Sequence, residues 1–108
     1  MLETLLQPGD QDERCGFILK DDTVVEITNV AKDKTLGYEM DPHEVLEYVD
    51  DAVATWHTHP DTDPNLSGED YSGFLSWPDM EHVIVGRRDG EVVVVRYRVQ
   101  HGLVIECD

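Results

Sequence analysis

Hydrophobic and polar residues alternate along much of the chain, and this alternation predicts a protein rich in β-strands. Residues 15–28 hold two short apolar runs, CGFILK and TVVEIT, which two aspartates separate, a pattern typical of a β-hairpin. Asp89-Gly90 and His101-Gly102 indicate tight turns further along the chain. Four other runs are rich in the β-branched residues that strands favour; they are AVATWHTH, HVIVGRR, EVVVVRYRV and LVIEC, at residues 52–59, 82–88, 91–99 and 103–107.

Two segments between these runs carry the signals of helix starts. In DPHEVLEYVDDA, Asp41 is a candidate N-cap and Pro42 suits the first helical position. A second helix is expected to begin at Ser67 in SGEDYSGFLSW and to end before Pro78. The N-terminal LETLL could form a short helical turn, and residues 29–40 have the polar, irregular character of a loop. The apolar face of the first helix is expected to consist of Val45, Leu46 and Val49.

The predicted order of elements is β-β-α-β-α-β-β-β, with no internal repeat. This order indicates an α/β domain in which helices pack on a single mixed β-sheet. A length of 108 residues suits one hydrophobic core, so we expect residues 1–108 to form a single domain.

The chain is strongly acidic, with 24 aspartates and glutamates against 8 lysines and arginines and a formal net charge of −16. Repulsion from phosphates argues against a nucleic-acid partner. A basic protein partner, a crowded assembly or a high-salt cytoplasm would suit this surface, and simple solubility explains it equally well. The sequence contains no run of about 18 apolar residues, so it predicts no membrane span. The N-terminal MLETLLQPGDQDER does not resemble a signal peptide, so we expect a cytoplasmic protein with no membrane partner.

Cys15 and Cys107 are the only cysteines. Their wide separation gives neither a disulfide framework nor the spacing of a metal-binding pair. Cys15 lies in the apolar CGFIL run and is expected to be a small buried residue.

The stretch TWHTHPDTDPNLSGED gathers the candidate chemistry. Residues i and i+2 of a strand project from the same face, so His57 and His59 are predicted to point to one side, with backbones about 7 Å apart. Pro60 ends the strand directly after the pair. Asp70 falls in the first turn of the next helix, where a loop can fold it back over the strand end. Two imidazoles and one carboxylate suit Zn²⁺ and leave a fourth position for water.

Each of these residues also has a structural explanation. A single histidine in a strand is more often structural than a ligand, and Ser67 with Asp70 forms the Ser-x-x-acid capping box of a helix start. The two roles are compatible, because one geometry can cap the helix and direct side chains into a cleft. The remaining histidines, His43, His82 and His101, are expected to lie in ordinary surface or turn positions without a role.

The set His57-x-His59-Pro60, then Ser67-x-x-Asp70, resembles the JAMM motif of the MPN+ (JAB) zinc metalloproteases, including its spacing. The family also has a glutamate near the start of its first core strand, and Glu13 in ERCGFIL matches that position. The resemblance covers roughly residues 12–100. It implies a JAB/MPN-like fold, with the layering of cytidine deaminases, over the whole single domain.

What the resemblance implies can be assigned to individual residues. His57, His59 and Asp70 correspond to the zinc ligands. Glu13 corresponds to the general base that moves a proton from water to the leaving amine, and Ser67 to the hydroxyl that stabilises the oxyanion. The implied reaction is hydrolysis of a peptide or isopeptide bond in a protein or peptide substrate. Without the downstream motif, Glu13 would be taken for a solvated acid in the acidic segment DQDER.

The short chain and the FLSWPDMEHVIVG block resemble the small JAB domains of phage tail-tip assembly proteins. That resemblance implies tail assembly, a tail-tip partner, and a location in the host cytoplasm or the virion tail. An alternative is the branch that processes sulfur-carrier or ubiquitin-like proteins, for which the acidity would suit a haloarchaeal member. Two further alternatives are a structural module without catalysis and a zinc phosphoesterase, although phosphoesterase sites usually gather ligands for more than one ion.

Overall fold

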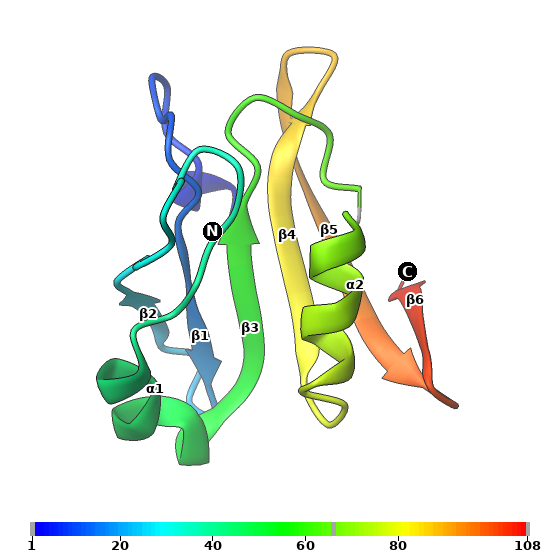
Figure 1. Cartoon of the computed structure of the whole chain (residues 1–108). Helices are drawn as coiled ribbons and strands as arrows, with labels where there is room; N and C mark the ends of the chain where they lie inside the picture. The colour runs from blue at the N-terminus through cyan, green and yellow to red at the C-terminus, as the bar shows by residue number, and fades with distance from the viewer. Residues whose placement is uncertain (1, 66, 108) are drawn as a thin grey trace.

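The computed structural model describes residues 2–65 and 67–107, which form one six-stranded sheet in the order β2-β1-β3-β4-β5-β6 (Figure 1). β3 and β4 are parallel, and the other neighbouring pairs are antiparallel, so the sheet is mixed. The predicted α/β class with a single mixed sheet is therefore confirmed. The strands are β1 (Cys15–Leu19), β2 (Val24–Ile27), β3 (Ala52–Thr58), β4 (Glu81–Arg88), β5 (Glu91–Gln100) and β6 (Leu103–Cys107).

The helices begin where their capping residues predict. The Asp41 side chain accepts a hydrogen bond from the backbone N–H of His43 at 2.9 Å, and Pro42 occupies the first turn of α1. Ser67 is the N-cap of α2. The N-terminal turn predicted in LETLL is also present, as a 3-10 helix. The helical elements are η1 (Leu2–Leu5), α1 (Pro42–Tyr48), η2 (Val49–Asp51) and α2 (Gly68–Leu75).

The predicted apolar face of α1 is wrong in one residue. Val45 and Val49 are half-buried, but Leu46 is 75% exposed. α1 has only seven residues before the backbone tightens into η2, and none of them is fully buried. Leu46 instead lines a groove on the surface.

Two hairpin turns follow the sequence prediction. Asp89 and Gly90 have φ angles of 53° and 81°, and His101 and Gly102 have φ angles of 55° and 76°. Positive φ at both central residues is the conformation that matches the twist of a two-residue hairpin. These turns connect β4 to β5 and β5 to β6, and they place β6 at one edge of the sheet.

The two faces of the sheet carry different layers. α2 packs on one face of the sheet (Figure 1). There Phe74 joins the cluster of Ile84, Val95 and Tyr97. Leu6, which follows η1, packs on the other face against Trp56, Val83 and Val85. Thr55, His57 and His82 also lie on the α2 face of the central strands.

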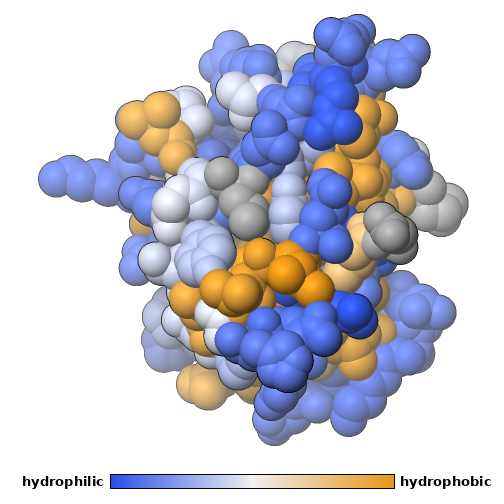
Figure 2. Space-filling model, turned by 90° about the vertical axis from the view of Figure 1, so that its right-hand side faces the viewer, coloured by the Kyte–Doolittle hydropathy of each residue, from blue (hydrophilic) through white to orange (hydrophobic). Residues whose placement is uncertain are grey.

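The outer surface reflects the polar composition. On the side of the molecule that bears α2 and β6, hydrophilic residues surround a limited apolar area (Figure 2).

Cys15 is fully buried, as predicted, and both cysteines are free thiols. In the described ranges 2–65 and 67–107, no helix is long and apolar enough to span a bilayer.

Candidate metal centre

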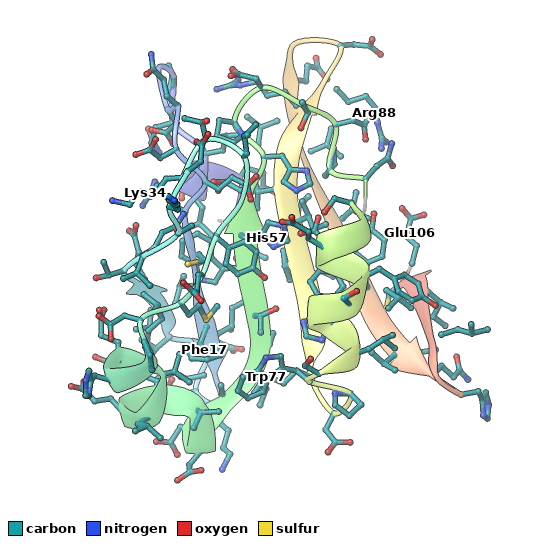
Figure 3. The ribbon with its side chains drawn as sticks, in the orientation of Figure 1. Phe17, Lys34, His57, Trp77, Arg88 and Glu106 are labelled. Carbon is teal, nitrogen blue, oxygen red and sulfur yellow. The ribbon has the colours of Figure 1, made fainter. Side chains whose placement is uncertain are left out.

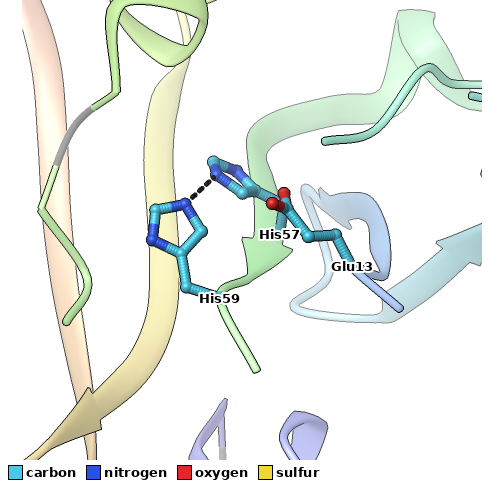
Figure 4. A group of neighbouring side chains, drawn as sticks. All are labelled: Glu13, His57 and His59. Carbon is cyan, nitrogen blue, oxygen red and sulfur yellow. Dashed lines mark hydrogen bonds between the residues drawn. The ribbon is translucent and has the colours of Figure 1, made fainter. Parts of the chain in front are cut away.

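The two motif histidines lie at the end of β3 on the face that α2 covers. Strand alternation turns His57 toward α2 (Figure 3), and His59 follows just beyond the strand end, where its backbone N–H donates to the Val85 carbonyl at 2.8 Å. His57 is 0% exposed and His59 is 8% exposed. The Nε2 atoms of the two rings are 3.2 Å apart (Figure 4), so the i, i+2 spacing brings both imidazoles to one point.

Asp70 reaches this point from the first turn of α2. Its Oδ1 lies 3.1 Å from His57 Nε2, and its Oδ2 lies 3.2 Å from His59 Nε2. Zinc–ligand bonds of about 2.0–2.1 Å at tetrahedral angles place two ligand atoms about 3.3 Å apart. The two nitrogens, and each nitrogen with its nearest Asp70 oxygen, therefore have about the spacing of two ligand atoms on one tetrahedral ion.

The hydrogen-bond partners show that this cluster needs a positive charge at its centre. His59 Nδ1 lies 3.1 Å from the Asp63 carbonyl oxygen, which can only accept, so Nδ1 carries the proton. In neutral His59, Nε2 then presents a lone pair to the Asp70 carboxylate, which is another acceptor. Either an added proton or a cation must lie between them, and an imidazole lone pair beside a carboxylate suits a dication such as Zn²⁺.

The pKa values in the cluster follow the same pattern. Burial alone would raise the pKa of Asp70, but hydrogen bonds from His57 and His59 hold it well below its ordinary range. Burial lowers the pKa of His57, and Asp70 only partly opposes this. Burial also disfavours charge on His59, but Asp70 and the Asp63 carbonyl raise its pKa above the ordinary value. The negative charge of Asp70 is therefore retained at neutral pH beside two imidazole nitrogens.

Glu13 approaches the histidines from the segment just before β1. Glu13 is 9% exposed, and one of its carboxylate oxygens and one ring nitrogen each of His57 and His59 all lie within 4.8 Å of one another (Figure 4). Its backbone is fixed by a bond from its N–H to the Lys34 carbonyl at 2.6 Å and by one from Asn29 Nδ2 to its own carbonyl at 2.8 Å. Glu13 thus joins the histidine pair from 44 residues away in the sequence.

The environment of Glu13 favours its protonated form. Burial, with smaller contributions from the negative charges of Asp70 and Glu69, raises the pKa of the Glu13 carboxyl to about 7, although His59 acts in the opposite direction. A carboxyl with a pKa near neutrality can both accept and return a proton. Its oxygens lie further from the histidine nitrogens than those of Asp70 do. An ion held between the two imidazoles would therefore have the Asp70 carboxylate nearer to it than that of Glu13.

Ser67 forms the capping box that the sequence predicts. Its Oγ accepts from the Asp70 N–H at 3.0 Å, and its own N–H donates to Asp70 Oδ2 at 3.1 Å. This reciprocal pair fixes the Asp70 carboxylate in the orientation that faces the histidines. Because a hydroxyl accepts and donates at once, its hydrogen can still be directed into the groove that Ser67 lines.

A groove with a volume of about 740 Å³ leads to the cluster, and it has a largely apolar wall. A smaller recess of about 300 Å³ adjoins the same site, and Glu13 and His59 line both spaces. The larger groove runs between α1, α2 and the loop before α1, and its apolar lining includes Leu36, Met40, Val45, Leu46, Phe74 and Trp77.

Sequence reasoning missed two residues beside the site. His82 was expected at an ordinary surface or turn position, but it is 0% exposed and that expectation is wrong. Its Nε2 donates to the Trp77 carbonyl at 3.0 Å, its Nδ1 lies 2.6 Å from the Thr55 hydroxyl, and its ring stacks on Phe74 at 4.2 Å. Its place at the start of the apolar run HVIVG, in a strand beside β3, is the signal that could have revealed this. His43 and His101 are exposed, as expected.

The second missed residue is Tyr38, from the loop before α1. Its ring lies against the His57 ring, with centroids 4.5 Å apart. His57 Nδ1 is buried and has no hydrogen-bond partner among the described residues. The Tyr38 ring packed against this imidazole helps to shield it from solvent. No periodicity in the irregular segment 29–40 signals this contact.

The fold and the cluster define the class of this protein. It is an α/β domain with two buried histidines and two buried carboxylates at the end of a groove, an arrangement that can hold one metal ion.

No family model matches the chain. Over 85 residues it is 35% identical to the desampylase of Haloferax volcanii, a match that covers 67% of this chain and 60% of that protein. The chain therefore spans less than two thirds of the length of this relative, whose similarity supports the JAMM/MPN resemblance.

Two solved structures share the fold at low sequence identity. The solution structure of DSY2949 from Desulfitobacterium hafniense has a TM-score of 0.73 and 19% identity, and the match covers 99% of this chain and 83% of that one. A Salinibacter ruber protein has a TM-score of 0.50 and 19% identity, with 94% of this chain and 76% of that chain covered. Neither these two nor the desampylase is described as a phage tail protein, so the phage expectation gains no support.

Proposed function

We propose that this chain is a JAMM-type, zinc-dependent isopeptidase that removes a ubiquitin-like protein from its target. The observation that carries the proposal is the convergence of Glu13 with His57, His59 and Asp70 at the end of a groove. We include in the proposal that residues 1–108 form one JAB/MPN+ domain and that His57, His59 and Asp70 hold the ion.

The residues of the site have separate tasks in this proposal. Zn²⁺, when bound, supplies Lewis acidity and makes hydroxide available near neutral pH. Glu13 takes a proton from the attacking water and passes it to the nitrogen of the leaving amine as the C–N bond breaks. The Ser67 hydroxyl donates a hydrogen bond to the carbonyl oxygen as negative charge develops on it. The groove beside His59 receives the polypeptide and limits the access of water.

The similarity to the desampylase favours this substrate class. Its name denotes removal of a SAMP-type modifier, which is a ubiquitin-like protein. This supports the alternative of a ubiquitin-like substrate over the phage-tail interpretation, for which the comparisons offer nothing. The high acidity also suits a protein of a high-salt cytoplasm.

The other two alternatives have less support. A scaffold would lose stability by burying four polar side chains together, because buried charges are costly unless they are paired or coordinate a metal. A phosphoesterase usually assembles ligands for two ions, whereas residues 2–65 and 67–107 bring histidines and carboxylates together at one centre only.

The proposal is tested by zinc content and hydrolysis measured on the same preparations. We expect equimolar zinc by elemental analysis and cleavage of a ubiquitin-like protein from a lysine-linked target. Glu13→Gln should keep the zinc and lower kcat by about 10²–10⁴-fold, the range for a lost general acid–base group. His57→Ala should lose both zinc and activity. A zinc-loaded wild type that cleaves neither peptide nor isopeptide bonds would contradict the proposal, as would a fully active Glu13→Gln.

A further inference from the structure

The orientation of His59 depends on a backbone carbonyl in the segment between β3 and α2. The Asp63 carbonyl oxygen lies 3.1 Å from His59 Nδ1 and fixes the proton on that nitrogen. Because the acceptor is a main-chain atom, its position depends on how the segment is held and not on the Asp63 side chain. Residues that hold segment 60–64 in place therefore also fix the position of this carbonyl.

β4 contacts this segment through Gly86 and Arg87. A Cβ atom at Gly86 would lie 2.6 Å from the Thr62 carbonyl oxygen and 2.7 Å from the Pro64 nitrogen, so only glycine permits the approach. The Arg87 N–H donates to the Thr62 carbonyl at 2.8 Å. Its Nε donates to the Pro60 carbonyl at 3.1 Å, so the chain before Asp63 is held twice.

β5 holds the other side of Asp63. The Tyr97 hydroxyl donates to the Pro64 carbonyl at 2.8 Å in a buried hydrogen bond. Tyr97 is 5% exposed, and Pro64 is among the fully buried side chains. The carbonyl that orients His59 therefore lies between two fixed points, Thr62 and Pro64.

A third contact to the same segment is of a different kind. Arg88 pairs with the Asp63 carboxylate through two contacts of 2.8 Å. These side chains are 46% and 37% exposed, and Figure 3 shows Arg88 at the outside of the molecule. Exposed pairs contribute about 0–1 kcal/mol, so this pair provides a natural control.

We propose that Gly86, Arg87 and Tyr97 are positioning residues, which we call the loop clamp. The loop clamp holds the Asp63 carbonyl against His59 Nδ1–H and thereby directs the Nε2 lone pair toward His57 and Asp70. Its effect on the imidazole is independent of the proposed function, whereas its effect on zinc affinity rests on that function.

The first test measures the His59 tautomer in the metal-free protein by ¹⁵N NMR at alkaline pH, where the imidazole is neutral. In the wild type we expect the proton on Nδ1. Tyr97→Phe keeps the ring but removes the bond to Pro64, and it should give a mixture with the Nε2–H tautomer. Arg88→Ala should leave the wild-type spectrum unchanged. An unchanged tautomer in Tyr97→Phe would overturn the proposal.

The second test measures the zinc dissociation constant by competition with a chromogenic chelator. Loss of one buried hydrogen bond in Tyr97→Phe should weaken binding about threefold to tenfold. Gly86→Ala should weaken it about 10- to 100-fold, the range for groups that orient metal ligands. Arg88→Ala should match the wild type. If Tyr97→Phe lowers only the melting temperature and leaves both zinc affinity and the His59 tautomer unchanged, the clamp has no positioning role.

The two tests separate the two ideas. If the wild type fails to bind zinc, the proposed function is wrong, but the tautomer measurement still decides whether the clamp orients His59. If Gly86→Ala does not fold, Tyr97→Phe alone decides the outcome, since it removes a single oxygen atom.

Discussion

Trp56 and His57 are neighbours in β3, and both are fully buried, yet they face opposite environments. Trp56 packs with Leu6, Val83 and Val85 in an apolar cluster. On the other face, His57 lies among a second histidine and two acids. Apolar contacts stabilise the fold by themselves, whereas buried ionisable groups cost free energy until a partner compensates them. The apolar face of the sheet therefore increases the free energy of unfolding, and the ionisable groups on the other face lower it.

The largest expected effect is on the apolar face. Trp56→Ala should lower the free energy of unfolding by about 3–5 kcal/mol, because it removes a large side chain and leaves a cavity. Chemical denaturation of the metal-free protein measures this loss. Zinc stoichiometry per folded molecule should stay the same, and a change in it would mean that the two faces are not independent.

The next effect concerns Glu13 and pH in the metal-free protein. Since the pKa of Glu13 is raised from 4.5 to about 7 on folding, ionisation of this group destabilises the native state. The wild type should lose stability relative to Glu13→Gln as the pH rises from about 4.5 to about 7, by up to about 3 kcal/mol. Parallel denaturation curves of both proteins across this range measure the difference. A constant difference would show that Glu13 is not held in a desolvated position.

A comparable effect follows for zinc and the ligand face. Zinc at about 100 times its dissociation constant should stabilise the wild type by about 2.7 kcal/mol. His57→Ala should abolish this gain, while its metal-free stability should change much less than that of Trp56→Ala. Thermal melts with and without zinc give both values. Equal stabilisation of the two proteins by zinc would place the ion elsewhere.

The smallest effect separates the two tasks of Ser67. Ser67→Ala should cost about 1 kcal/mol through the lost N-cap and should also reduce kcat. Ser67→Asn keeps a good N-cap residue but lacks the hydroxyl, so it should retain stability while kcat falls. Denaturation and kinetics on both variants distinguish the roles. If Ser67→Asn is as active as the wild type, the hydroxyl serves only as a cap.

Much of the fold follows from local patterns. The β-branched runs, the positive-φ turns at Asp89-Gly90 and His101-Gly102, and the caps at Asp41 and Ser67 all depend on residues close in sequence. Such features are predictable because the forces that create them act over a few residues. Leu46 is the exception, since exposure on a short helix depends on what packs against it.

The site required contacts that no local pattern contains. The i, i+2 spacing predicts that His57 and His59 share a face, but Glu13 reaches them only because β1 pairs with β3 and sets Cys15 opposite His57. That pairing is a choice among several strand orders, and the motif resemblance, not periodicity, pointed to Glu13. Tyr38 and His82 join the site through the loop before α1 and through β4, and only the folded chain brings them together.

The parallel pairing of β3 with β4 limits how the chain can vary in length. A parallel pair requires the intervening chain to cross back along the sheet, and α2 lies within that crossover. One residue inserted between Ser67 and Asp70 would rotate the carboxylate by about 100° around the helix axis and away from the imidazoles. An insertion at the Asp89-Gly90 turn would only lengthen a hairpin. Natural relatives with an intact centre should therefore differ in length at the hairpins and keep the Ser67–Asp70 spacing constant.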